Sequence, residues 1–336
     1  MSYQVLFLCH AGKGIGLGHF SRSVVAGRAL VKNFGYPVEF IVIGDGIKKK
    51  IEYKGLKIRE TNDSVTDVIS SIVGEKSHDL ICLDLFKPLL TEPIGELLNQ
   101  ISSAGTKIVT IDHLMLTSTK IDLIYVPSFL PPPNLKRLAT NKIVAGWDCF
   151  LLNIKTDCER KTTKPNVLVL TGGSDVTELG MKWPDLLDKG LSKNIIINWV
   201  VGPYSQKPRL PVSISRKFNK HIAPPSLTEL MLHATAAATL YGVSFFELVA
   251  LGIPTVVFSP YGQKDKNELS EIKRLEIAYV ASNEVEATNM LAKLIKDKGE
   301  RERLSSNCKN LMGNHNGKRF AHEVQTLLSS VTEAKR

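Results

Sequence analysis

The sequence predicts an α/β protein built from two doubly wound parallel sheets. Its 336 residues exceed what one hydrophobic core commonly holds, about 250–300 residues. Short continuous apolar runs alternate with helical patterns along the chain, which is typical of parallel strands covered by helices on both faces. Each half also opens with an apolar run followed by a glycine-bearing loop. We therefore expect two domains of similar architecture.

In the first half, five apolar runs are predicted as buried strands, with amphipathic helices between several of them. The predicted strands are residues 4–9, 38–43, 80–83, 107–111 and 123–126. The predicted helices are residues 19–32, 65–73 and 94–103.

The second half repeats this alternation without repeating the sequence. Its predicted strands are residues 166–170, 195–201, 236–240, 255–258 and 278–281. Helices are predicted at residues 176–189, 226–233, 244–251, 265–275 and 284–297.

A polar segment, residues 156–165, precedes the first strand of the second half and predicts the domain boundary. We expect an N-terminal Rossmann-like domain at 1–155, a C-terminal domain at 164–312, and a C-terminal helix and tail at 313–336. Ligands of doubly wound sheets bind outside the carboxyl ends of the strands. If the two domains face each other, the expected site is the cleft between them.

The composition predicts a soluble protein of the reduced cytoplasm. Hydrophobic residues make up 43% and charged residues 23%, which is ordinary for a globular chain. The start has no basic region of the kind that opens a signal peptide. No apolar run approaches the roughly 20 residues of a membrane helix. The five cysteines are an odd number without a CxxC pair, which argues against a disulfide or zinc framework.

The net charge of +10 is spread along the chain, with its densest run at Lys48-Lys49-Lys50. Aromatic residues do not alternate with the basic ones, so a nucleic-acid platform is not expected. A basic face suits anionic nucleotides, and peripheral association with an anionic membrane is the alternative. The oligomeric state is left open.

The stretch from Ala236 to Asn267 carries the strongest functional signal. An apolar run ends at Tyr241-Gly242, and a helix is predicted to begin near Ser244. Backbone N–H groups at such a helix N-terminus, those of Gly242, Val243 and Ser244, suit a phosphate. One turn into the helix, the carboxylate of Glu247 could accept both hydroxyls of a ribose. Gln263 and Asn267 follow the next strand, so the pattern predicts a nucleotide-sugar site.

The first glycine loop runs from Gly12 to His19 and opens a helix. It fits neither the P-loop nor the G-x-G-x-x-G pattern, so a dinucleotide oxidoreductase is only an alternative. Gly18 allows a ligand to approach the backbone closely, and His19 is predicted as a general base at the helix start. Arg22, one turn later, is either an exposed helix residue or an anion contact.

The second glycine loop is Thr171-Gly172-Gly173-Ser174-Asp175. Ser174 or Asp175 can cap the following helix, which would explain the loop by structure alone. As the first loop of the second domain, it is also expected to face the ligand cleft, with Gly172, Gly173 and Ser174 near the donor.

Taken together, these pieces resemble the GT-B glycosyltransferase superfamily. The resemblance is to the group of the pseudaminic-acid-pathway UDP-sugar hydrolase and the spore-coat polysaccharide glycosyltransferase-like proteins. The enzyme that adds N-acetylglucosamine to the lipid-linked peptidoglycan precursor is a more distant likeness. The matching pieces are Gly16-Leu17-Gly18-His19 with Arg22, Leu83-Asp84, Ile111-Asp112, Asp122-Leu123-Ile124, Ala145-Gly146, Thr171 to Asp175, Gly242 with Ser244 and Glu247, Gly252-Ile253-Pro254, Gln263 with Asn267, and Asn316-Gly317 with Arg319.

The resemblance implies that His19 is the catalytic base, that Gly242, Ser244 and Glu247 hold a uridine nucleotide, and that no metal or other cofactor is needed. Two departures stand out. Tyr241 replaces a glycine of the family pattern, which would narrow the phosphate pocket. Phe86 replaces a tyrosine of the hydrolase active site.

Three functions follow. The first is a glycosyltransferase acting on a UDP-sugar and an unknown acceptor, expected in polysaccharide biosynthesis in the cytoplasm or at the inner face of the membrane. The second is a UDP-sugar hydrolase of a nonulosonate-type sugar pathway. The third is a non-catalytic nucleotide-sugar-binding subunit, against which the presence of His19 argues.

Overall fold

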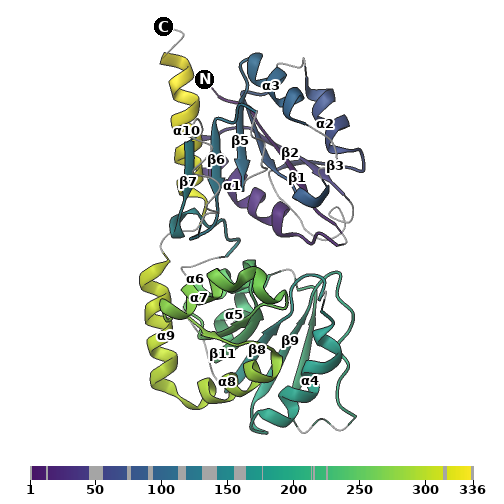
Figure 1. The fold of residues 1–336 in the computed structure, drawn as a ribbon, viewed down its shortest axis with the longest axis vertical. Coiled ribbons are helices and arrows are strands. Elements are labelled where there is room, and N and C mark those ends of the chain that lie inside the picture. The colour runs from purple at the N-terminus through teal and green to yellow at the C-terminus, as the bar shows by residue number, and fades with distance from the viewer. Residues whose placement is uncertain are drawn as a thin grey trace. The chain divides into compact units, whose positions relative to one another are not determined.

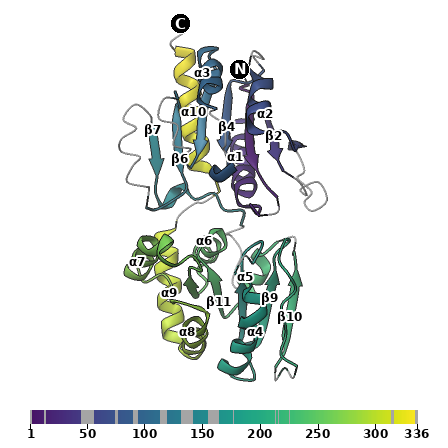
Figure 2. The same ribbon diagram turned by 45° about the vertical axis from the view of Figure 1, so that its right-hand side comes forward.

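The computed structural model describes residues 2–12, 14–44, 56–73, 77–89, 94–112, 119–130, 142–154, 164–175, 177–212, 214, 216–224, 226–312 and 316–333. The chain forms two compact units (Figures 1 and 2). One unit comprises Met1–Asn153 with Asn314–Arg336, and the other comprises Ile154–Gly313. Most of the predicted boundary segment and the run at 48–50 lie outside the described residues.

The first unit contains a seven-stranded sheet in the order β3-β2-β1-β4-β5-β6-β7. All of its neighbouring strands are parallel. The strands are β1 (Val5–His10), β2 (Val38–Ile43), β3 (Lys57–Thr61), β4 (Leu80–Asp84), β5 (Lys107–Ile111), β6 (Leu123–Val126) and β7 (Lys142–Ala145). The five predicted strands are confirmed. The two that the sequence did not predict, β3 and β7, are the edge strands. β3 has a single apolar residue, Ile58, and the apolar run of β7 is only three residues long.

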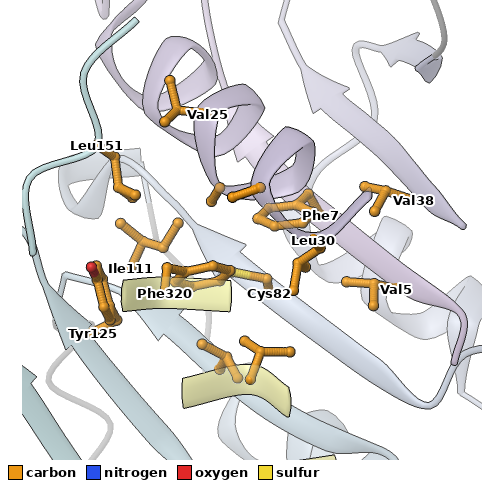
Figure 3. Close-up of a cluster of buried hydrophobic side chains, with 14 of the residues drawn as sticks. Val5, Phe7, Val25, Leu30, Val38, Cys82, Ile111, Tyr125, Leu151 and Phe320 are labelled. Carbon is orange, nitrogen blue, oxygen red and sulfur yellow. The ribbon is translucent and has the colours of Figure 1, made fainter. Parts of the chain in front are cut away.

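Helices cover both faces of this sheet. They are α1 (Gly18–Phe34), α2 (Val65–Ile72), α3 (Gly95–Ser103) and α10 (Lys318–Glu333). One buried cluster joins strand residues such as Phe7 and Tyr125 to α1 and α10, and the other joins Leu8 and Leu83 to α2 and α3. Figure 3 shows Phe320 of α10 within the first cluster, beside Tyr125 and Cys82. Its ring centroid lies 5.1 Å from that of Tyr125. The C-terminal helix therefore completes the core of the first unit.

The second unit contains a six-stranded parallel sheet in the order β10-β9-β8-β11-β12-β13. Its strands are β8 (Asn166–Leu170), β9 (Ile196–Val201), β10 (Phe218–Ile222), β11 (Ala236–Leu240), β12 (Thr255–Phe258) and β13 (Tyr279–Val280). Its helices are α4 (Leu179–Gly190), α5 (Thr228–His233), α6 (Val243–Ala250), α7 (Lys266–Arg274), α8 (Glu284–Lys296) and α9 (Lys298–Leu311). The half-exposed edge strand β10 and the polar surface helix α9 are not predicted by the sequence pattern.

Helix α4 begins three residues later than predicted. Asp175 and Glu178 have positive φ angles of 44° and 53°, so the chain turns before the helix can start. Trp183 of α4 and Trp199 of β9 are fully buried in the core of this unit. The Trp183 indole N–H donates to Thr288 Oγ1 at 3.0 Å, which ties α4 to α8.

Both sheets share one winding scheme, in which the chain builds three strands outward and then returns to the other side of the first. The reversal falls between β1 and β4 in one unit and between β8 and β11 in the other. The carboxyl ends of strands at such a switch point are where doubly wound sheets bind ligands. Within the described ranges, no helix is both long enough and apolar enough to cross a membrane.

Candidate functional site

The loop after β1 brings His19 to the switch point of the first sheet. The Gly16 N–H donates to the Gly12 carbonyl at 2.8 Å, and Gly16 has a φ of +81° that suits a glycine. This tight turn ends as α1 begins at Gly18, which places His19 on the first turn of the helix. The predicted arrangement of glycine loop, helix start and histidine is therefore present.

Asp84, the last residue of β4, joins His19 to Arg22. His19 Nδ1 lies 2.6 Å from Asp84 Oδ1. Arg22 donates to both carboxylate oxygens, from Nη2 to Oδ1 at 2.6 Å and from Nε to Oδ2 at 2.7 Å. Ser23 Oγ donates to Oδ2 at 3.2 Å. The carboxyl group is fully buried and is surrounded by donors.

The electrostatics make Asp84 an anion at neutral pH. Burial opposes its ionisation, but the charge and hydrogen bonds of Arg22, with the hydrogen bond of His19, outweigh it and lower the pKa of Asp84. Arg22 Nη2 also lies 3.2 Å from His19 Nδ1, but the contact of Nδ1 with Asp84 is much shorter. Because a carboxylate only accepts hydrogen bonds, His19 Nδ1 carries the proton in this pair. His19 Nε2 is then left with a lone pair that can accept a proton, and Asp84 would stabilise the imidazolium that forms.

Asp84 is one of the pieces that resemble the GT-B superfamily, but the sequence alone assigns it no role. The signal in the sequence is an acidic residue at the end of a buried apolar run. Arg22, in contrast, was predicted as a possible anion contact. Its guanidinium is occupied by Asp84, with Asp112 Oδ2 3.7 Å from Nη1. Its contact with a donor stays a prediction.

In the second unit, the loop after β8 exposes Gly172 and Gly173, with Ser174 half-buried. Asp175 fills the capping role, since its carboxylate accepts from the N–H groups of Leu179 at 3.0 Å and Gly180 at 2.8 Å. Of the two predicted capping residues, the structure thus uses Asp175.

The loop after β9, which contains Gly202 and Tyr204, packs against this glycine loop. A Cβ placed on Gly202 would lie 2.4 Å from the carbonyl oxygens of Gly172 and Gly173. The Gly173 carbonyl also accepts from the Tyr204 N–H at 2.9 Å. The absence of a side chain at Gly202 therefore lets the two loops pack together.

Helix α6 starts directly after β11, with Gly242 in the N-cap position and no side chain capping it. In the described part of the chain, the N–H groups of Gly242, Val243 and Ser244 make no hydrogen bond. They stand at the positive end of the helix dipole, which suits a phosphate group. The Tyr241 ring packs edge-on against Phe246, at a centroid distance of 5.7 Å.

Glu247 lies one turn into α6. No described residue forms a hydrogen bond or ion pair with its carboxyl group. Burial raises its pKa to about 7 from the ordinary value of 4.5. A partly buried carboxyl group without a partner is costly to ionise, and perturbed groups of this kind gather at functional sites.

Gln263 lies in a 3₁₀ helix, Gly262–Asp265, that follows β12, and Asn267 lies on the first turn of α7. Both side chains are exposed. The segment before them is fixed because Ser259 Oγ donates to Asp265 Oδ2 at 2.5 Å.

Strands β8, β11 and β12 are neighbours in the sheet, so the donor-side residues predicted in the second unit follow three adjacent strand ends. Gly18 and Arg22, which were also predicted to contact the donor, lie on α1 of the first unit. The described residues contain no cluster of three or more side chains suited to holding a metal ion. The first unit therefore offers a proton acceptor, His19 Nε2, at the carboxyl ends of its strands. The second unit offers the free N–H groups at the start of α6 and the carboxyl group of Glu247, which has no partner among the described residues.

No protein-family model matches the chain. Among curated proteins, an uncharacterised protein of Methanocaldococcus jannaschii, MJ1062, is 26% identical over 268 residues. The match covers 72% of this chain and 53% of that protein, so the chain spans about half the length of the curated relative.

Solved structures of glycosyltransferases match nearly the whole chain. The calicheamicin glycosyltransferase CalG4 aligns with a TM-score of 0.63 at 12% identity, covering 98% of both chains. MurG of Acinetobacter baumannii aligns at 0.62 and 12% identity, covering 96% of this chain and 99% of its own. UGT2 of Phytolacca americana, solved with UDP-2-fluoro-glucose and pterostilbene, aligns at 0.63 and 13% identity, covering 98% and 100%. The predicted fold is confirmed, because the two parallel-sheet units match GT-B glycosyltransferase structures.

Proposed function

We propose that this protein is a metal-independent glycosyltransferase that transfers a sugar from a UDP-sugar to an acceptor hydroxyl. The observation that carries the proposal is the His19–Asp84 pair at the switch point of the first sheet, joined at 2.6 Å. The sheet edge of the second unit, with its free N–H groups and Glu247, supports a nucleotide-sugar donor. In this proposal, residues 1–155 bind the acceptor and residues 164–312 bind the donor.

In the proposed reaction, His19 Nε2 takes the proton of the acceptor hydroxyl as its oxygen attacks the anomeric carbon of the donor sugar. Asp84 stabilises the imidazolium through Nδ1–H. The bond between the anomeric carbon and the diphosphate oxygen breaks, and UDP leaves with both electrons of that bond. The N–H groups at the start of α6 stabilise the charge on the departing diphosphate.

On the donor side, the carboxylate of Glu247 accepts hydrogen bonds from the two ribose hydroxyls. Gly172, Gly173 and Ser174 approach the donor through the backbone, while Gln263 and Asn267 contact the sugar or the phosphates. The solved structure of UGT2 with UDP-2-fluoro-glucose supports UDP as the nucleotide, since that protein shares the fold.

We place the enzyme in the group of spore-coat polysaccharide glycosyltransferase-like proteins, acting in polysaccharide biosynthesis in the cytoplasm or at the membrane surface. Phe86 favours transfer over hydrolysis. Its ring lies beside His19, at a centroid distance of 5.9 Å, and offers no hydroxyl to orient a water molecule.

The test is a panel of UDP-, GDP- and dTDP-sugars, incubated with and without a mixture of carbohydrate acceptors and followed by NMR. A transferase gives nucleotide release that depends on an acceptor. Rapid release of free sugar without an acceptor would instead establish a hydrolase. Binding without turnover in either condition would establish a non-catalytic binder.

A further inference from the structure

His10 is a second histidine at the same switch point, and the reaction proposed above does not use it. It is the last residue of β1, and only 1% of its surface is exposed. The strand that it ends lies beside β4, which ends at Asp84. Phe86 connects the two histidines, because its N–H donates to His10 Nδ1 at 2.8 Å and its ring lies beside His19.

The hydrogen bond from Phe86 fixes the tautomer of His10. Nδ1 accepts this bond and therefore carries no proton, so the proton of the neutral ring is on Nε2. Burial and the nearby His19 lower the pKa of His10 to about 4, and the charge of Asp84 only partly offsets them. His10 is thus an uncharged hydrogen-bond donor throughout the neutral range.

The donor at Nε2 has no hydrogen-bond partner within the described ranges. An unmet donor on a nearly buried side chain is unfavourable. Such a group calls for a ligand or an ordered water.

We propose that His10 Nε2–H donates a hydrogen bond to a hydroxyl oxygen of a carbohydrate acceptor and so orients it for deprotonation by His19. This assignment rests on the proposed function. A neutral donor suits an uncharged oxygen, whereas phosphate or carboxylate recognition would favour a cation. His10 cannot be a second base, because Nδ1 is occupied and Nε2 already carries a proton.

Two variants separate the two nitrogens. His10→Asn keeps an oxygen near the position of Nδ1 for the Phe86 N–H and removes the donor at Nε2. His10→Gln keeps an amide donor near Nε2 and loses the acceptor for Phe86. His233→Asn, on an exposed histidine of α5, is the matched control.

Turnover is measured with the donor and the carbohydrate acceptor selected by the sugar panel. For His10→Asn we expect the acceptor KM to rise about tenfold or more, because one hydrogen bond to the acceptor is lost. The donor KM should change less than about twofold. His10→Gln should keep a higher kcat/KM than His10→Asn. The reverse order would show that His10 only holds the Phe86 backbone, and equal losses or no loss in both would also overturn the proposal.

A spectroscopic measurement keeps this test separate from the proposed function. Long-range ¹H–¹⁵N spectra should show the His10 ring protonated only at Nε2 near pH 7, with the signals assigned by their absence in His10→Asn. Methyl glycosides added at high concentration should shift the Nε2 resonance. Protonation at Nδ1, or no shift with any glycoside, would refute the assignment. If the wild-type protein turns over no donor, the proposed function fails, and these spectra alone decide the role of His10.

Discussion

Replacing Glu247 by glutamine should stabilise the second unit and weaken donor binding at the same time. The carboxyl group sits on α6 without a partner among the described residues, and burial raises its pKa from 4.5 to about 7. Glutamine has nearly the same shape and cannot ionise. The variant therefore removes the cost of a buried charge and also removes the proposed ribose contact.

The magnitude follows from the pKa. At about 1.4 kcal/mol for each tenfold change in proton affinity, a rise from 4.5 to about 7 makes the ionised form cost about 3 kcal/mol. Because Glu247 is only partly buried, this is an upper value. The folded-state pKa lies above the unfolded one, so the protonated group stabilises the fold fully below pH 4.5. That contribution is lost as the pH rises through 7. The advantage of Glu247→Gln should thus be small at pH 5 and largest at pH 8.

The assay is urea unfolding at pH 5 and pH 8, followed by tryptophan fluorescence. Trp183 and Trp199 are buried in the second unit, and a Trp147→Phe background removes the tryptophan of the first unit. Glu229→Gln, on an exposed side chain of α5, is the control and should show no such dependence on pH. Equal stability of Glu247→Gln and wild type at pH 8, or an equal gain at both pH values, would refute the reasoning.

The other predictions concern both units. Uridine, which carries no phosphate, should bind the wild-type protein about tenfold more weakly at pH 6 than at pH 8, because Glu247 loses its charge below about pH 7. In Glu247→Gln the uridine affinity, measured by calorimetry, should not depend on pH. Asp84→Asn leaves the partly buried Arg22 cation without its main carboxylate partner. The first unit should therefore lose about 3 kcal/mol in chemical denaturation, and an unchanged midpoint would contradict the geometry. Gly202→Ala forces a Cβ to within 2.4 Å of two carbonyl oxygens of the glycine loop after β8. The affinity for UDP should therefore fall about tenfold, while the first unit keeps its structure around His19. An unchanged UDP affinity would show that this loop does not contact the donor. Arg216→Met removes a side chain only 1% exposed that holds Asp188, Ser192 and Leu191, and should cost about 3 kcal/mol of stability without changing UDP affinity in the folded protein.

The alternation of apolar runs predicted the central strands of both sheets, because strands buried on both faces leave continuous hydrophobic sequence. Edge strands do not. The sequence Phe218–Ile222, for example, is half-exposed and mixes lysine, asparagine and histidine, so it resembles a loop. Polar surface helices such as α9 are missed for the same reason, since their weak apolar stripe carries little signal.

In the candidate site, local patterns predicted the residues whose role depends on one loop and one helix start, such as His19 and Gly242. They could not predict contacts made across strands. Asp84 receives its role from α1, which is distant in sequence, and His10 receives its tautomer from the backbone of Phe86. The raised pKa of Glu247 likewise depends on burial within the folded unit.

The central claim is tested most directly by the rate of UDP release from the selected UDP-sugar in His19→Ala, with and without acceptor, beside the affinity of the variant for UDP. We expect acceptor-dependent UDP release to fall at least about a hundredfold, the usual contribution of a general base, while the Kd for UDP stays within about twofold of wild type. His233→Asn should match the wild-type protein in both measurements. Wild-type release of UDP by His19→Ala would contradict the proposed catalytic base and, with it, the proposed mechanism.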